Sequence, residues 1–329
     1  MTITEFLDHH FRHFNARETV AASKAWIAHL DNGGKMLLTL AGAMSTAELG
    51  ISLARMIRED KVHAICSTAA NFEEDFFNLL AHDEYYIASN YRDLSPVDEA
   101  ALCEKGFNRV TDTCIPETVI RHLEGNLIDV WQAAINKSES YFPYEYFFQL
   151  LDQDRLSQHY QIPPEHSWVI AAWEKKIPIY TPGWEDSTLG NVFTARCIEE
   201  RISLPADARF TSPHQAIKSG TQQLEHLVHW YQATDRENSI GFFQIGGGIA
   251  GDFPICAVPL MRQDMELDIR HWGYFCQISD STTSYGSYSG AVPNEKITWD
   301  KLDVDAPKFM INSDASIVAP LVFAYVLGD

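Results

Sequence analysis

Positively charged residues are scarce in this sequence of 329 residues. Lysine and arginine number 25 against 45 aspartates and glutamates, so the formal net charge is -20. Proteins bind nucleic acid through clustered lysine and arginine, so this composition argues against a nucleic-acid partner. The excess of carboxylates suits a cationic small-molecule substrate, although it also fits an acidic protein that binds no such ligand.

Further absences concern the location of the protein. The first residues, MTITEFLDHHFRHFN, are amphipathic and lack the apolar core of a secretion signal. No uncharged apolar run is long enough to span a bilayer. The six cysteines are scattered without CxxC pairs, which is typical of reduced proteins with free thiols. We therefore expect a cytoplasmic protein without a membrane partner.

The sequence also lacks internal repeats and linkers rich in proline, glycine or serine. We therefore expect one domain over residues 1–329, in which residues 1–34 form a helical N-terminal extension. Continuous apolar runs are typical of strands buried on both faces. They predict strands at 35–44, 62–69, 177–181, 240–245, 274–280 and 308–314.

Helices are expected between these strands. Thr2 with Glu5, and Ser45 with Glu48, have capping-box spacing, and Asn32-Gly33-Gly34 is a typical helix stop. The predicted helices include 17–31, 45–60, 120–136, 143–154, 214–233 and 317–327, and residues 95–175 are expected to be mostly helical. This alternation predicts an α/β protein with a Rossmann-like, doubly wound, mainly parallel sheet.

Small and polar residues follow several of the predicted strands. Gly246-Gly-Gly-Ile-Ala-Gly251 follows the strand 240–245 and fits the G-x-G-x-x-G pattern, in which glycines let a backbone approach a pyrophosphate closely. Tight glycine turns are also common for packing alone. Four other strands end in Ala43-Met-Ser45, Ser67-Thr-Ala69, Asp280-Ser281 and Asp314-Ala315. Because ligands bind at the carboxyl ends of strands in open parallel sheets, these endings together favour a ligand site.

Three polar clusters each admit two interpretations. Glu73-Glu74-Asp75 is either a solvated helix N-terminus or a set of carboxylates that faces a cation or a ribose. The stretch Ser281–Gly290 is either a ligand-binding loop or a surface loop, and it has no G-x-S-x-G elbow for a nucleophilic serine. His226 and His229 lack the spacing of a zinc motif, which favours a solvated helix face and no metal site.

The stretch VPNEKITWDKLDVDAP, residues 292–307, places Trp299 two residues before Lys301 and after Glu295. Its turn-forming residues predict an exposed bend. The alternative is a lysine that is held against an aromatic ring for chemistry.

With these residues, the sequence resembles the deoxyhypusine synthase family. The motifs are GGG at 246–248, SGA at 289–291, P-x-E at 293–295, TWDK at 298–301 for the family's S-W-G-K, and SDAS at 313–316 for its A-D-A-S. Weaker matches in the same order are STAANFEED at 67–75 and EDSTLGN at 185–191.

The resemblance implies an NAD-dependent enzyme that is a homotetramer with active sites at dimer interfaces. In the family reaction NAD takes a hydride from spermidine, and the aminobutyl group then passes through a lysine Schiff base to an acceptor amine. Lys301 would be the catalytic nucleophile and Trp299 its aromatic wall, a face that attracts cations. NAD contacts carry over to Met44, Ser45, Thr46, Ala47, Glu48, Thr68, Ala69, Ala70, Glu74, Asp186, Gly247, Asp280, Ser281, Asp314 and Ala315. Substrate contacts carry over to Glu73, Asn191, Gly286, Ser287, Tyr288 and Glu295.

The departures from the family pattern concern the amine pocket. Asn191 replaces the second aspartate of D-G-S-L-G-D, and Tyr285 and Tyr288 replace both aspartates of D-G-S-D-S-G-A. Asp252-Phe253 stands where the family has a histidine pair. Carboxylates that would grip the far amine of spermidine are therefore lost, while the lysine is kept.

The favoured hypothesis is an NAD-dependent transferase of alkyl groups other than methyl. It would move an aminobutyl group from a polyamine through a Lys301 imine to a small acceptor amine, as a homospermidine synthase does. One alternative is a true deoxyhypusine synthase that modifies a lysine of a translation factor. The other is a non-catalytic NAD-binding oligomer.

Overall fold

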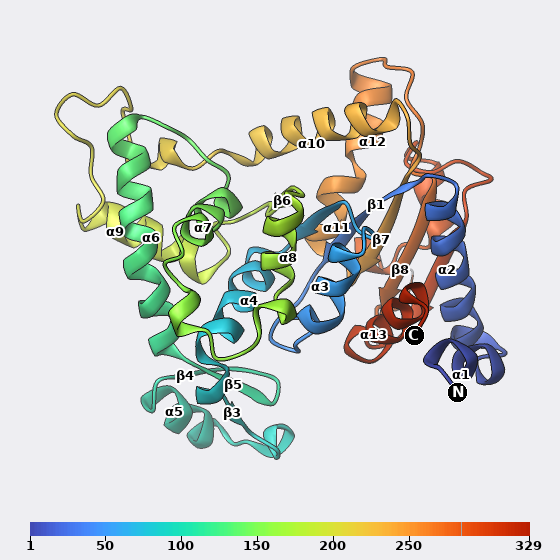
Figure 1. The fold of residues 1–329 in the computed structure, drawn as a ribbon, viewed down its shortest axis with the longest axis horizontal. Coiled ribbons are helices and arrows are strands. Elements are labelled where there is room, and N and C mark those ends of the chain that lie inside the picture. The colour runs from blue at the N-terminus through green and yellow to red at the C-terminus, as the bar shows by residue number, and fades with distance from the viewer. Residues whose placement is uncertain (284) are drawn as a thin grey trace.

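A six-stranded parallel sheet forms the centre of the computed structural model, which describes residues 1–283 and 285–329. The strands are β1 (Lys35–Leu40), β2 (Ala64–Ser67), β6 (Ile179–Tyr180), β7 (Ile240–Ile245), β8 (Tyr274–Ser279) and β9 (Lys308–Asn312). Their order is β6-β2-β1-β7-β8-β9, and every neighbouring pair is parallel (Figure 1). The chain builds outward on one side of β1 and then on the other, which confirms the predicted doubly wound α/β fold.

Helices cover both faces of this sheet. They are α1 (Ile3–His10), α2 (Phe14–Asp31), α3 (Gly50–Arg58), α4 (Ala69–Ala81), α5 (Pro96–Glu104), α6 (Glu117–Lys137), α7 (Pro143–Asp152), α8 (Trp168–Lys175), α9 (Thr188–Ile198), α10 (Gly220–Asp235), α11 (Gly248–Ile255), α12 (Ala257–Pro259) and α13 (Ala315–Leu327). Within the described residues, no helix combines the length and apolar character needed to cross a bilayer.

Successive residues of a strand point to opposite faces, so each strand supplies two cores. Met36 and Leu38 belong to a large core with α2, α3, α4, α8 and α13. Leu37, between them, belongs to a second core with α10, α11 and α12. This double burial explains why the strands read as continuous apolar runs.

The two capping-box patterns have different outcomes. Thr2 caps α1 as predicted, because its hydroxyl accepts from Glu5 N at 3.1 Å while the Glu5 carboxylate accepts from Thr2 N at 2.9 Å. The predicted helix start at Ser45 is wrong, since α3 begins at Gly50. Glu48 has a φ of +55°, outside the right-handed helical region, and the Ser45 hydroxyl accepts a hydrogen bond from Trp168 Nε1 at 2.9 Å.

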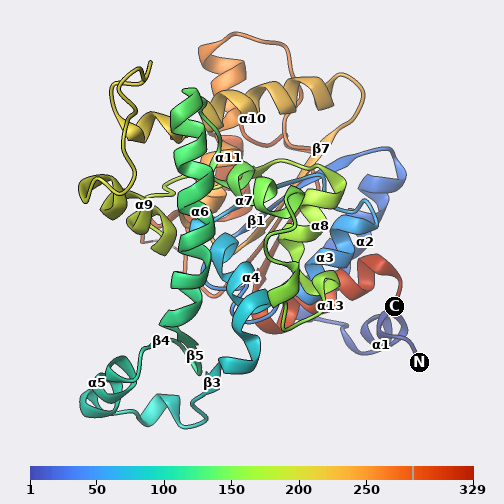
Figure 2. The same cartoon turned by 60° about the vertical axis from the view of Figure 1, so that its left-hand side comes forward.

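The expectation of a mostly helical segment 95–175 missed part of a second, antiparallel sheet. Its strands are β3 (Tyr86–Ile87), β4 (Phe107–Val110) and β5 (Thr113–Pro116), in the order β3-β5-β4. Figure 2 shows this small sheet projecting with α5 from the body of the molecule. Thr111, at φ +51°, forms the turn between β4 and β5, so no glycine or asparagine marks the hairpin.

Helix α10 begins later than its predicted start at 214. Residues Pro213–Ala216 form a separate short 3-10 helix. Ser219 and Gln222 then make a capping box, in which the Ser219 hydroxyl accepts from Gln222 N at 3.3 Å. The cap therefore fixes the first residue of the helix at Gly220.

Candidate functional site

The carboxyl ends of the parallel strands lie along one edge of the sheet, and residues predicted to bind the cofactor follow them. Thr68 caps α4 after β2, where its hydroxyl accepts from Asn71 N at 3.3 Å. Asp314 caps α13 after β9, where its carboxylate accepts from Ser316 N at 2.8 Å. The other members of this edge are Met44, Ser45, Thr46, Ala47, Ala69, Ala70, Gly247, Asp280, Ser281 and Ala315.

Asn71 ties the ends of β1 and β2 together, a role that sequence reasoning missed. Its side-chain Nδ2 donates to Gly42 O at 2.6 Å, and its Oδ1 accepts from Ser45 N at 2.9 Å. Glu48, also predicted to bind the cofactor, lies 2.7 Å from His82 Nε2 and lines a separate pocket with Asp75. The loop after β1 is therefore fixed, but Glu48 is not grouped with the other predicted residues.

The glycine turn after β7 is shaped by its backbone and by packing. Gly246 and Gly248 have φ values of +73° and +58°, a left-handed conformation that favours glycine. A Cβ on Gly247 would lie 1.9 Å from Ser289 Oγ. The Gln277 amide joins the same two segments, because it donates to Gly246 O at 3.0 Å and to Ser289 O at 2.9 Å. The turn and its packing thus account for glycine at these three positions, and the predicted cofactor contact at Gly247 stays a prediction.

A first pocket, here called the acidic pocket, lies between α4, β4, β5, α6 and the start of α9 and has a volume of about 530 Å³. It brings together five of the predicted site residues, namely Ala70, Glu73, Glu74, Asp186 and Asn191. Asn191 Nδ2 donates to Ser187 O at 2.6 Å, so its amide also braces the first turn of α9.

The carboxylates of α4 are buried, which corrects the interpretation of Glu73-Glu74-Asp75 as a solvated helix end. Glu73 is 3% exposed and accepts from Thr188 N and Leu189 N, both at 2.9 Å. Burial nevertheless raises the pKa of Glu73 above its ordinary value. Asp75 is bound to Ser167 and to Val169 N at the start of α8. Glu73 and Asp75 therefore connect α4 to the N-termini of two other helices.

Glu74 differs from its neighbours because one of its oxygens is unpaired. Oε2 is buried and has no hydrogen-bond partner within the part of the chain that the structure describes. Burial, together with the charge of Glu73, raises the pKa of Glu74 to about 7. A carboxyl group that exchanges its proton near neutral pH and lines a pocket is a candidate for ligand binding or proton transfer.

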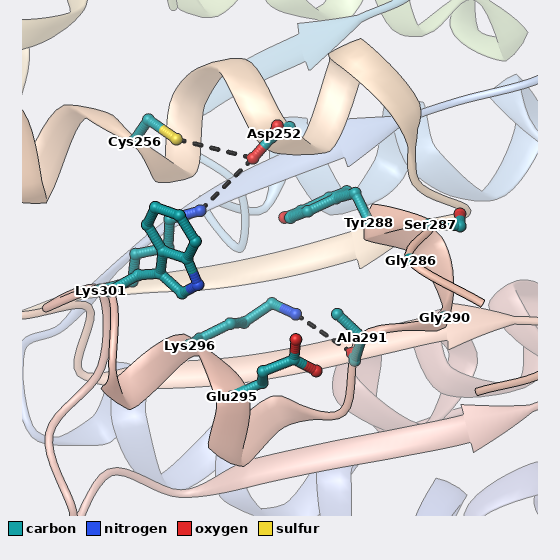
Figure 3. A pocket seen from close by; sticks show the side chains of 11 residues that line it. Asp252, Cys256, Gly286, Ser287, Tyr288, Gly290, Ala291, Glu295, Lys296 and Lys301 are labelled. Carbon is teal, nitrogen blue, oxygen red and sulfur yellow. Dashed lines mark hydrogen bonds and ion pairs between the residues drawn. The ribbon is translucent and has the colours of Figure 1, made fainter. Parts of the chain in front are cut away.

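A second pocket, here called the lysine pocket, lies between α11 and residues 286–301 and has a volume of about 330 Å³ (Figure 3). It brings together six of the predicted residues, namely Gly286, Ser287, Tyr288, Glu295, Trp299 and Lys301. Its other lining side chains include Asp252, Cys256 and Lys296. The lysine pocket and the acidic pocket share no lining residue.

Lys301 is buried, whereas its aromatic neighbour is not. Lys301 is 7% exposed, and Trp299 is 64% exposed. The Lys301 Nζ donates to Asp252 Oδ1 at 3.4 Å and lies 5.7 Å from the Trp299 ring and 5.6 Å from the Tyr288 ring. Asp252 and Tyr288, two of the departures from the family pattern, are therefore the direct neighbours of this amine.

Lys296 is a further lysine of this pocket, and sequence reasoning missed it. It is 2% exposed, and its Nζ donates to Ala291 O at 3.3 Å. The same Nζ lies 4.8 Å from the Phe275 ring and 5.1 Å from the Tyr288 ring. Burial, together with the charge of Lys301, lowers the pKa of Lys296 to about 8. The sequence signal that could have identified Lys296 is the presence of a second lysine in the bend that carries Lys301.

The histidines of α10 do not gather metal ligands. His226 Nδ1 lies 3.0 Å from the Tyr180 hydroxyl and is half-buried, so the solvated-face interpretation is wrong for His226, while His229 is exposed. Among the residues that the structure describes, no group of three or more histidine, cysteine, aspartate or glutamate side chains could hold a metal ion.

Comparison with known proteins identifies the family. A sequence profile described as "Deoxyhypusine synthase" matches residues 8–326. The chain belongs to the deoxyhypusine synthase family. The resemblance that the motifs indicated is thereby confirmed.

Relatives of this family are similar over nearly the whole chain. The "Deoxyhypusine synthase-like protein" of Cyanothece sp. is 27% identical over 344 residues, which cover 100% of this chain and 80% of the relative. The "Probable deoxyhypusine synthase 1" of Archaeoglobus fulgidus is 25% identical over 317 residues, which cover 95% and 90%. The crystal structure of a "putative deoxyhypusine synthase" from Entamoeba histolytica has a TM-score of 0.58 at 12% identity and covers 100% and 94%, which supports the fold.

Deoxyhypusine synthase family chemistry is NAD-dependent aminobutyl transfer. The lysine pocket holds this chain's counterpart of the family's S-W-G-K motif, at Thr298–Lys301. The strand ends hold the counterpart of its A-D-A-S motif, at Ser313–Ser316.

Proposed function

We propose that this protein is an NAD-dependent transferase that moves an alkylamine group from a polyamine, through a Lys301 imine, to a small acceptor amine. The observation that carries the proposal is the buried Lys301 amine, whose Nζ lies within 5.7 Å of the Trp299 ring and 5.6 Å of the Tyr288 ring in a pocket. Burial of Lys301 limits the access of water, which protects an imine from hydrolysis.

NAD fits the residues at the strand ends. Glu74 offers a buried oxygen without a partner, and Asp280 and Asp314 present exposed carboxylates after β8 and β9, the kind of group that binds ribose hydroxyls. When bound, NAD supplies the hydride acceptor that converts the donor amine to an imine and the hydride that later reduces the product. We assign its binding to Met44, Ser45, Thr46, Ala47, Thr68, Ala69, Ala70, Glu74, Asp186, Gly247, Asp280, Ser281, Asp314 and Ala315.

Amine recognition would fall to two carboxylates and an aromatic ring. Asp252 and Glu295 both line the lysine pocket, and they can pair with an ammonium group of the donor. The Tyr288 hydroxyl donates to Gln244 Oε1 at 2.8 Å, so its ring is held in place as a wall for cations. With a tyrosine where the family has an aspartate, the pocket suits a smaller or less charged amine than spermidine.

We further propose that the complete site forms between two copies of the chain within a homotetramer. In a single copy the acidic pocket and the lysine pocket share no lining residue. Apolar side chains are exposed around the lysine segment, with Val292 at 43%, Trp299 at 64% and Val304 at 70% exposure. Such exposed groups suit an interface that a second copy covers.

The test is adduct trapping. The protein is incubated with NAD and spermidine, putrescine or agmatine, reduced with borohydride, and mapped by peptide mass spectrometry. The proposal expects an alkylamine adduct on Lys301 and a free small-molecule product, both lost in Lys301→Arg. The matched control is Lys105→Arg at an exposed lysine, which should leave both unchanged.

Other outcomes decide between the alternatives. Transfer to a protein lysine, without a free amine product, would favour a true deoxyhypusine synthase. If neither NAD binding nor an adduct is found with any of these amines, both enzymatic functions are wrong.

A further inference from the structure

Two lysine amines face one aromatic ring in the lysine pocket. The Nζ atoms of Lys296 and Lys301 lie 5.1 Å and 5.6 Å from the Tyr288 ring centroid. Both side chains come from the same short segment, and Figure 3 shows Lys301 directed toward Asp252 on α11 and Lys296 directed toward Ala291. The proposed function uses one of these amines and leaves Lys296 without a role.

Packing alone is a poor explanation for Lys296. Lysines that pack only through their stems extend the charged end to water, but this residue is 2% exposed. Lys301 has a carboxylate partner, Asp252, whereas the polar contact of the Lys296 amine within the described residues is the Ala291 carbonyl. The charges of Glu295 and Asp252 act on the Lys296 amine, but it forms no ion pair among the described residues. Burial of an ammonium without such a pair is disfavoured, so this position suits an amine that gives up its charge.

We propose that Lys296, as a neutral amine, accepts the proton that Lys301 must release before its Nζ can bond to an imine carbon. This inference rests on the proposed function, because it assumes that Lys301 forms an imine. The surroundings agree with it, since the pKa of Lys296 is lowered to about 8. The charged and titratable groups that face it are Lys301 and Glu295 on its own segment, Asp252 and Cys256 on α11, and Tyr288.

The step balances without any change in oxidation state. One proton moves from the Lys301 ammonium to the Lys296 amine, which frees the Lys301 lone pair. A bond forms between Lys301 Nζ and the imine carbon, and the bond from that carbon to the departing amine then breaks. The donor imine is protonated, and after the bond forms the Lys301 nitrogen passes one of its protons to the departing nitrogen. The departing amine takes a second proton from Lys296 and leaves as an ammonium ion. Lys301 is left as the protonated imine and Lys296 is neutral again.

Asp252 is a less suitable acceptor for this proton. Its carboxylate already accepts the hydrogen bond from Lys301, and its side chain is 50% exposed. Carboxylates are also weaker bases than amines, so they drive this transfer less. The two groups therefore have different tasks in this proposal: Asp252 orients the Lys301 amine, and Lys296 removes its proton.

The test uses butyraldehyde and cyanoborohydride, which alkylate an unprotonated lysine without NAD or a polyamine. Labelling of Lys301 is followed by peptide mass spectrometry from pH 6 to pH 10. The parent protein should show a rate that rises with a midpoint near the pKa of Lys296, about 8. Lys296→Met should slow labelling at pH 8 by roughly 10²-fold and abolish that midpoint, because a general base contributes about 10²–10⁴-fold.

Lys296→Arg distinguishes a base from a charge. Arginine keeps the positive charge but cannot accept the proton, so Lys301 should be labelled as slowly in Lys296→Arg as in Lys296→Met. If Lys296→Arg instead restored the parent labelling rate, the proposal would be overturned. Unchanged labelling in Lys296→Met, or labelling of Lys296 itself in place of Lys301, would also overturn it. Lys137→Met, at an exposed lysine, is the control. Circular dichroism and melting curves check that each variant is folded.

The two proposals can fail separately. If Lys301 is not labelled in the parent at any pH, its imine chemistry is wrong and this inference falls with it. If labelling depends on Lys296 but no amine is transferred with NAD present, the proposed function is wrong and the proton transfer stands.

Discussion

The acidic pocket and the lysine pocket bury groups of opposite charge and are built in different ways. The acidic pocket is assembled from segments that are far apart in sequence, from Ala70 to Asn191. The lysine pocket comes almost entirely from residues 286–301, with Asp252 and Cys256 added by α11. In both pockets burial is the largest cause of a pKa shift, which brings Glu74 to about 7 and Lys296 to about 8. Desolvation thus moves an acid and a base toward neutrality from opposite sides.

Removing the proposed nucleophile should have the largest effect. In Lys301→Ala the covalent route is lost, so amine transfer should fall by roughly 10³-fold or more. NAD binding, measured by fluorescence titration, should persist, because the cofactor is assigned to the strand ends. Equal loss of transfer and of NAD binding would contradict the separation of tasks between the two regions.

Mixing two inactive variants tests whether the regions act together across copies of the chain. Lys301→Ala and Glu74→Ala should each be inactive alone. After subunit exchange at equal amounts, about a quarter of the parent activity should return, because half of the dimers then carry one intact site of two. Failure to recover activity, despite exchange confirmed by native mass spectrometry, would place the whole site within one copy.

The two buried groups should affect stability with opposite pH dependence. The folded-state pKa of Glu74 is raised to about 7 from an ordinary value of 4.5. Folding therefore becomes less favourable as pH rises from 4.5 to 7, because Glu74 must ionise while it is buried. This ionisation lowers the free energy of unfolding by at most about 3 kcal/mol, and the full effect is present above pH 7. Glu74→Gln should be more stable than the parent in urea unfolding at pH 8 and show little gain at pH 4. The exposed Glu104→Gln is the control and should show neither difference.

The stability cost of Lys296 should have the opposite pH dependence. Its folded-state pKa is lowered to about 8 from 10.5, so its cost is complete below pH 8 and disappears as pH rises to 10.5. Lys296→Met should therefore raise the free energy of unfolding at pH 7, by at most about 3 kcal/mol, and the gain should shrink at pH 10. A gain that is the same at both values would mean that the amine is not the source of the cost.

The smallest effect is expected at the outer wall of the lysine pocket. Trp299 is exposed, so its contact with a cation is worth only about 0.5–1 kcal/mol. Trp299→Ala should raise the KM for the donor amine by roughly two- to fivefold, and Trp299→Phe by less. A loss as large as that of Lys301→Ala would show that the indole takes part in more than binding.

Much of the fold follows from local sequence, because strands buried on both faces are mostly apolar, as β1 (KMLLTL) and β7 (IGFFQI) are. What local patterns miss depends on distant partners. The Ser45 hydroxyl accepts from Trp168 Nε1, 123 residues further along the chain, and the buried Glu73 carboxylate accepts from N–H groups 115 and 116 residues further along.

The candidate site shows the same limit. Motif matching selects Lys301 because the family keeps a lysine there, but it passes over Lys296, whose burial arises from the rings of Phe275 and Tyr288. Likewise, the pairing of Lys301 with Asp252 joins residues 49 positions apart, and no local spacing encodes it. Residue types are thus readable from the sequence, whereas protonation states require the folded surroundings.

The exposure of Trp299 has a spectroscopic consequence. Of the eight tryptophans, it is the most exposed, while Trp26, Trp131, Trp168 and Trp272 are fully buried. Acrylamide in solution will therefore quench Trp299 first, and its emission will be the most red-shifted. A ligand or a second chain that covers the lysine pocket will shield this fluorophore, so the protein carries its own optical reporter of occupancy.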